Sequence, residues 1–181
     1  IISWPVTLAI MVLAFGSLVA AGLPLLLTLA GLVASAGGLV LLNELTPISV
    51  WAMNFAMMFA LALGIDYALF LVVRFRDALR KTIDAGRIDP QRAVAETMDT
   101  AGKAVLLSGL TVLISLSAVL LVPAPAVRTM AVGIMLAVVF VLAATLTLLP
   151  AVLGKLGPKV NAGSLPYAKR QVHRSPKFAS W

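Results

Sequence analysis

One acidic residue stands inside a long apolar run of this sequence. Asp66 is followed by Tyr67, and the next charged residue is Arg74, eight positions later. In a helix that separation is about 12 Å, and the single methylene of an aspartate cannot carry its carboxylate to water over that distance. Burying an aspartate at such a depth in a membrane costs about 2.5–3.5 kcal/mol. We therefore expect Asp66 to have a polar partner, to be protonated, or to serve a function.

Asp66 and Tyr67 are the residues best suited to proton transfer. Burial favours the protonated form of a carboxyl group, and a carboxyl group that alternates between its charged and neutral forms can carry protons. The tyrosine hydroxyl can donate to the anion or accept from the acid. The alternative is that Asp66 keeps one permanent hydrogen-bond partner and only holds helices together. We predict a proton relay at Asp66 and Tyr67.

Three hydroxyl side chains further along the chain are candidate supports for this pair. Ser108, Thr111 and Ser115 follow one another at helical spacing and share a face. They are able to hydrogen-bond Asp66 or to line a path for water. Equally, serine and threonine in membrane helices often donate to carbonyl groups of their own helix and permit close packing.

The sequence offers little other chemistry. It has no cysteine, which excludes a disulfide framework or a thiolate metal site, and its single histidine is His173. It has no glycine-rich phosphate loop followed by Lys-Ser/Thr, no nucleophile elbow and no paired-carboxylate arrangement of a hydrolase. We therefore predict that the chain is not an enzyme and that it holds no cofactor or metal.

Composition places the chain in a membrane. Of its 181 residues, 61% are hydrophobic and only 12% are charged, which is too little polar surface for a soluble domain of this size. Residues 1–43 carry no charge. Because about 20 apolar residues suffice for one crossing, this run is long enough for two. The net charge of +7 fits basic residues that flank membrane spans better than it fits nucleic-acid binding.

The predicted fold is an all-α, polytopic membrane bundle of five transmembrane helices plus an amphipathic cytoplasmic helix. Gly22-Leu23-Pro24 is expected to break the first apolar run, because proline cannot continue a helix interior. The predicted spans are residues 4–21, 24–42, 49–73, 104–122 and 129–153. Residues 74–103 are then a cytoplasmic loop, residues 1–153 the bundle, and residues 154–181 a basic cytoplasmic tail or connector.

The third predicted span has two different faces. Ala60, Gly64 and Ala68 form a stripe of small residues that allows another helix to approach closely. Asp66 projects to the other side, on the side of Phe59, Leu63 and Phe70. We therefore expect this span to be central in the bundle, with protein on both sides.

The distribution of basic residues predicts the orientation. Of the 14 lysines and arginines, all but Arg128 lie in residues 74–103 or 154–181, and such segments stay on the cytoplasmic side. The N-terminus is then outside and the C-terminus inside. An odd number of crossings that begins outside suggests a segment of a longer polypeptide.

A further helix is predicted inside the loop 74–103. Asp89 can cap the free N–H groups of a first turn, and Pro90 suits the first helical position. Apolar residues then recur at steps of three and four, which indicates an amphipathic helix against the membrane face or the bundle. We expect this helix to run through Gly102 and Lys103 into the fourth span.

Several stretches together resemble the mycobacterial membrane protein large (MmpL) family of the resistance-nodulation-division superfamily. "GIDYALFLVVRFRDAL" (64–79) is similar to the family's fourth transmembrane helix, and "TAGKAVLLSGLTV" (100–112) to the start of the next. "LTLLPAVLGKLGPKVN" (146–161) is similar to the end of the sixth, and "FGSLVAAGLPLL" (15–26) to the second helix and its turn into the third. The chain would then be transmembrane helices two to six of the first half.

This resemblance implies export of lipids or other hydrophobic compounds across the inner membrane, driven by inward proton flow. Asp66 and Tyr67 fall on the family's Asp-Tyr pair. The resemblance implies that this pair relays protons by bonding with a matching Asp-Tyr pair in the second half. The implied partners are a lipid or hydrophobic substrate, protons, membrane lipids and the remaining half of the transporter, with no nucleic acid. Two alternatives stay open: a sterol-sensing-like module that binds lipid for regulation, and a protein-secretion accessory of the same superfamily.

Overall fold

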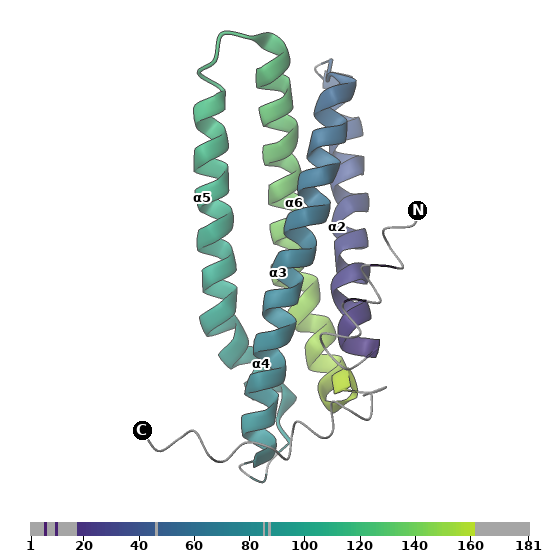
Figure 1. Cartoon of the computed structure of the whole chain (residues 1–181), viewed down its shortest axis with the longest axis vertical. Coiled ribbons are helices and arrows are strands. Elements are labelled where there is room, and N and C mark those ends of the chain that lie inside the picture. The colour runs from purple at the N-terminus through teal and green to yellow at the C-terminus, as the bar shows by residue number, and fades with distance from the viewer. Residues whose placement is uncertain are drawn as a thin grey trace.

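The computed structural model is a bundle of long antiparallel helices and describes residues 6, 10, 18–45, 47–84, 86 and 88–161 (Figure 1). Four of its helical segments are long and apolar enough to cross a membrane: Ala20–Leu45, Val50–Asp84, Pro90–Val119 and Pro125–Val160. The described residues contain no strand. The prediction of an all-α protein that crosses a membrane several times is therefore confirmed.

The helices follow one another up and down the bundle. They are α2 (Leu18–Leu45), α3 (Val50–Asp84), α4 (Pro90–Thr97), α5 (Lys103–Val119) and α6 (Pro125–Leu156). A π turn, η1 (Met98–Gly102), joins α4 to α5, and a 3-10 turn, η2 (Gly157–Asn161), follows α6. The first predicted span, 4–21, lies mostly outside the described residues, and its end, 18–21, belongs to α2. The number of five spans is therefore not confirmed.

The predicted helix break at Gly22-Leu23-Pro24 is wrong. Helix α2 runs through these residues without interruption, with Pro24 inside it. The hydroxyl of Thr28, one turn further on, donates to the carbonyl of Pro24 at 2.6 Å. Membrane helices tolerate proline where neighbouring helices and Ser or Thr side chains restore the polar contacts that it removes.

The predicted loop 74–103 is mostly helical. Helix α3 continues eleven residues past the expected end at Val73 and ends at Asp84. Asp89 caps α4 as predicted, because its carboxylate accepts from the N–H of Arg92 at 3.0 Å and Pro90 takes the first helical position. The helix then passes through η1 directly into α5, as the sequence predicts.

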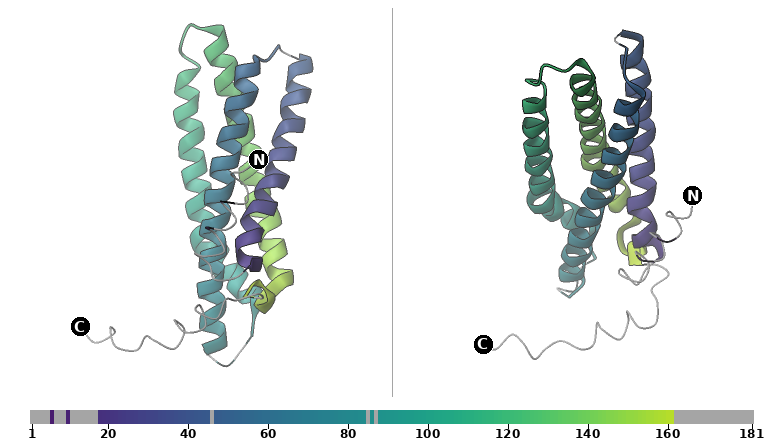
Figure 2. Two further views of the ribbon diagram at one scale, coloured as in Figure 1. Left: turned by 45° about the vertical axis from the view of Figure 1, so that its right-hand side comes forward. Right: turned by 45° about the horizontal axis from the view of Figure 1, so that its top comes forward.

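Helix α3 packs against α2 and α6, while α5 stands further out and packs mainly on α6 (Figures 1 and 2). Small residues mediate these contacts. A Cβ atom added at Gly133 of α6 would lie 3.7 Å from the Cβ of Ala52 of α3, and one added at Gly31 of α2 would lie 3.4 Å from a methyl group of Val141. The hydroxyl of Ser35 in α2 donates to its own helix and also lies 3.4 Å from the carbonyl of Ala137 in α6.

The end of α6 meets the start of α4. Gly157 ends α6 with a φ of 48°, which is in the region that favours glycine. A Cβ atom at this position would lie 2.9 Å from the ring of Pro90. This contact holds α4 against the bundle, where Ala93 and Thr97 are buried.

Candidate functional site

Asp66 lies on an exposed face of α3. The residues of this face recur at steps of three and four and are all exposed in the described part of the chain: Phe59, Ala62, Asp66, Phe70 and Val73. This spacing is that of a seam along which one helix packs against another. We call these five residues the α3 seam. No described residue hydrogen-bonds or forms an ion pair with the Asp66 carboxylate.

The opposite face of α3 is fixed by close packing. Ala60, Gly64 and Ala68 are buried, which confirms the predicted stripe of small residues. A Cβ atom added at Gly64 would lie 2.8 Å from the methyl group of Thr28 and 3.1 Å from its hydroxyl oxygen. The close contact between α2 and α3 therefore determines the direction in which Asp66 projects.

Tyr67 does not share the exposure of Asp66. Its side chain is only 8% exposed and belongs to the core. Consecutive residues of a helix are rotated by about 100°, so their side chains do not face each other. Within the described residues, no hydrogen bond joins Asp66 to Tyr67. The structure thus holds both side chains at one level of α3 but points them in different directions.

The three candidate supporting hydroxyls lie on α5 and are exposed. Ser108 donates to the carbonyl of Val105 at 3.2 Å, and Thr111 donates to that of Leu107 at 2.9 Å. These two contacts match the alternative interpretation, in which the hydroxyl donates to a carbonyl of its own helix. None of Ser108, Thr111 and Ser115 hydrogen-bonds Asp66 in the part of the chain that the structure describes.

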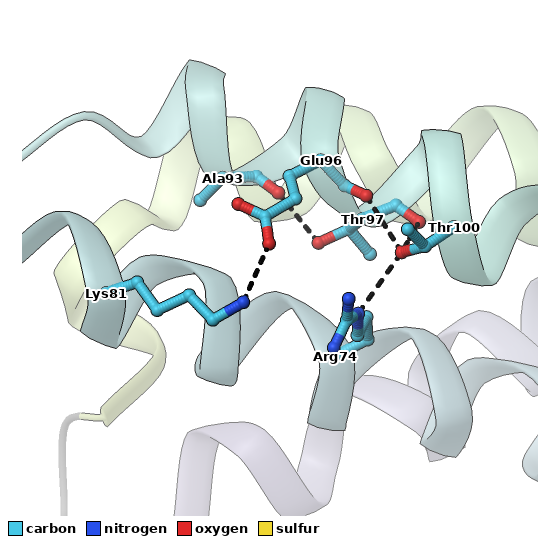
Figure 3. A network of polar contacts seen from close by, with 6 residues as sticks. All are labelled: Arg74, Lys81, Ala93, Glu96, Thr97 and Thr100. Atoms are coloured by element: carbon cyan, nitrogen blue, oxygen red, sulfur yellow. Dashed lines mark hydrogen bonds and ion pairs between the residues drawn. The ribbon is translucent and has the colours of Figure 1, made fainter.

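A polar network that sequence reasoning missed joins the end of α3 to α4 and η1 (Figure 3). The Lys81 ammonium lies 3.0 Å from the Glu96 carboxylate, and the Nε of Arg74 donates to the Thr100 hydroxyl at 3.1 Å. Thr100 in turn donates to the carbonyl of Glu96 at 2.9 Å. The pairs are 15 and 26 residues apart in sequence, and no local pattern reveals which side chains will meet.

The described residues contain no group of three or more His, Cys, Asp or Glu side chains arranged to hold a metal ion. The Asp66 carboxylate lies in the middle of the exposed α3 seam, at a point fixed by the packing of Gly64 against Thr28 behind it.

Comparison with known proteins gives the same family over the whole chain. The MMPL family matches residues 1–181. A putative membrane protein of Streptomyces coelicolor is 41% identical over 169 residues, which are 93% of this chain and 23% of the relative.

Two further relatives carry functional names. The mycolic acid-containing lipids exporter MmpL11 of Mycolicibacterium smegmatis is 42% identical over 84% of this chain and 16% of its own length. The heme uptake protein MmpL11 of Mycobacterium tuberculosis is 42% identical over 82% of this chain and 15% of its own length. The chain spans less than a quarter of the length of each of these relatives. It belongs to the MMPL family of the resistance-nodulation-division superfamily.

Proposed function

We propose that this chain is the proton-relay segment of a proton-driven MmpL-type transporter, and that Asp66 carries the proton. The observation that supports this most directly is the position of Asp66. It is the only charged residue between Val50 and Val73 of α3, and it stands in the middle of the exposed α3 seam. A carboxylate at such a depth is costly, and the cost is accounted for if Asp66 cycles between its protonated and ionised forms.

The partner of the α3 seam is a helix from the other half of the transporter. Because Asp66 and Tyr67 point in different directions, each reaches a group on a neighbouring helix more readily than it reaches the other. A facing Asp-Tyr pair gives Asp66 a hydroxyl, whereas Tyr67, which is only 8% exposed, stays in the core of the described helices. Protons then pass between the two helices, while the tight packing behind Gly64 keeps Asp66 in register.

The transported compound is a lipid or another hydrophobic molecule. The relatives' names mention a mycolic acid-containing lipid in one case and heme in the other, and both compounds are largely apolar. The described helices of this chain carry the proton step, and selection of the compound belongs to other parts of the transporter. The membrane is the inner membrane, with the basic end of the bundle on the cytoplasmic side.

The test is Asp66→Asn in the full-length transporter, reconstituted in vesicles with an imposed pH gradient. Asparagine has nearly the same shape but cannot exchange a proton, so we expect loss of both proton uptake, measured with an internal pH dye, and movement of a labelled lipid. Asp66→Glu keeps the carboxyl group and should retain part of the activity. Transport by Asp66→Asn at the wild-type rate would refute the proposal.

A further inference from the structure

Thr145 of α6 differs from the other buried hydroxyl residues of the bundle. Its side chain is 4% exposed, and the other buried polar side chains of the described residues are Thr28, Ser35 and Thr97. Each of these three donates to the carbonyl four residues earlier in its own helix, at 2.6–2.7 Å. The Thr145 hydroxyl forms no hydrogen bond within the described part of the chain. An unpaired buried hydroxyl is costly, which indicates that Thr145 has a partner other than its own helix.

Tyr67 of α3 carries a second buried hydroxyl of this kind. Its side chain is 8% exposed and lies in the core, and among the described residues its hydroxyl has no hydrogen-bond partner. Neither this oxygen nor that of Thr145 is completely sealed, because every completely sealed polar side-chain atom of the described residues has a partner. Each hydroxyl therefore has room for a partner and can form a hydrogen bond without first breaking another.

Helices α3 and α6 pack side by side and run in the same direction, from the top of Figure 1 to its bottom. Two contacts fix how they are aligned. Near their beginnings, Ala52 of α3 lies against Gly133 of α6. Further along, Leu71 of α3 and Leu149 of α6 line the same small apolar pocket. The two helices therefore stay in contact along the stretch between these points.

Tyr67 and Thr145 lie at the same level of this helix contact. Tyr67 precedes Leu71 by four residues, and Thr145 precedes Leu149 by four. Residues four apart share a helix face, so both side chains lie one turn before the point where the two leucines meet. Asp66 points to the other side of α3. The alignment thus brings the Tyr67 hydroxyl toward α6 and not toward the carboxylate beside it in sequence.

We infer that Thr145 is the hydrogen-bond partner of Tyr67, directly or through one water molecule, and that it positions α3 for the proton step. This inference rests on the proposed function and adds a residue of α6 to it. A threonine suits this place because its hydroxyl both donates and accepts, while its methyl group fills the packed contact. The bond fixes the rotation of α3 about its axis at the level of Asp66, so the carboxyl group keeps its place in the α3 seam.

The first test compares Thr145→Val with Thr145→Ser in the full-length transporter. Valine keeps the shape of threonine but not its hydroxyl, whereas serine keeps the hydroxyl but not the methyl group. We expect proton uptake by reconstituted vesicles to fall about fivefold in Thr145→Val, the effect of one hydrogen bond, and by less than about twofold in Thr145→Ser. A role in packing alone gives the reverse order, because serine leaves a space and valine does not.

The second test is a double-mutant cycle with Tyr67→Phe, measured by melting temperature and by proton uptake. Tyr67→Phe already removes the hydroxyl that Thr145 binds, so adding Thr145→Val should cause little further loss in either measurement. Thr147→Val is the matched control, because the Thr147 hydroxyl is exposed and donates to the carbonyl of Ala143 at 2.5 Å. Its effect should be the same with and without Tyr67→Phe.

Three results would overturn the inference. A larger loss of proton uptake in Thr145→Ser than in Thr145→Val would mean that the methyl group matters and the hydroxyl does not. Additive losses of melting temperature in the cycle would mean that the two hydroxyls do not meet. Coupling in melting temperature without coupling in proton uptake would mean that they meet but do not position the proton step. The cycle in melting temperature does not involve Asp66, so it stays informative if Asp66→Asn transports normally and only the proposed function fails.

Discussion

Ala60 and Asp66 lie six residues apart on one helix, yet the first is fully buried and the second is exposed. Helical periodicity is enough to predict that they point to different sides, because each residue advances by about 100°. It also predicts that small residues mark the side that packs tightly. Periodicity cannot predict what covers the other side. That depends on chain segments distant in sequence, so the expected shielding of Asp66 remains a prediction.

The contact that fixes Asp66 should be sensitive to one methyl group. Gly64→Ala places a Cβ atom 2.8 Å from Thr28, and overpacking of this kind costs about 1–3 kcal/mol. We expect a lower melting temperature of the purified transporter. The combined change Gly64→Ala with Thr28→Ala should recover most of the loss, because it removes the atoms that clash.

Gly37→Ala is the matched control for this substitution. Gly37 also lies inside a membrane helix, but a Cβ atom added there meets nothing within 4 Å. Alanine favours a helix more than glycine does, so stability should stay the same or rise slightly. Equal losses in the two alanine variants would show that Gly64 matters for backbone reasons and not for its contact with Thr28.

At the scale of helices, local capping residues predicted the helix ends better than charged residues did. The start of α4 was predictable because an Asp-Pro capping pair acts within one turn. The end of α3 was not predictable in this way. A first arginine indicates where an apolar span ends and not where its helix ends, because arginine and lysine themselves favour helix. Pro24 was misread for a related reason, since a proline breaks a helix only where its surroundings do not compensate for the missing donor.

The pairing of α3 with α6 can be tested by crosslinking. Ala52 and an added Cβ at Gly133 are 3.7 Å apart, which lies within the range for a disulfide, and the chain has no cysteine of its own. Ala52→Cys with Gly133→Cys should therefore crosslink readily under mild oxidation. After cleavage at a protease site introduced into the 120–124 turn, the two fragments should stay joined until reduced.

The control for this pair is Gly37→Cys with Gly133→Cys, which also spans the cleaved turn. Position 37 faces open space, so we expect no more than background crosslinking. Efficient crosslinking of the control pair, or none of the Ala52–Gly133 pair, would contradict the observed packing of the helices.

At the scale of the whole molecule, the described bundle has a packed side and an open side. Helix α3 packs on α2 and α6 and makes few contacts with α5, which packs mainly on α6. The α3 seam is exposed and lies away from the contacts with α2 and α6. A seam of this length and spacing is suited to a partner helix. The sequence predicts that partner only through family resemblance, because no feature within these residues specifies a segment that lies elsewhere.

Two substitutions on neighbouring turns distinguish the two sides. Ala60→Trp forces a large ring into the packed side and should reduce folded yield and melting temperature. Ala62→Trp, on the α3 seam, should leave folding of these helices intact but reduce transport by the whole protein, because it disturbs the partner helix. If Ala62→Trp were silent in both measurements, the α3 seam would face lipid and not protein.

The first and last described helices meet at one end of the bundle, where η2 contacts α2 (Figure 1). A chain that crosses a bundle an even number of times begins and ends at the same surface. Two such blocks joined in tandem would therefore stand the same way up, related by rotation about the membrane normal. Any domain spliced into the 120–124 turn would instead emerge on the far surface.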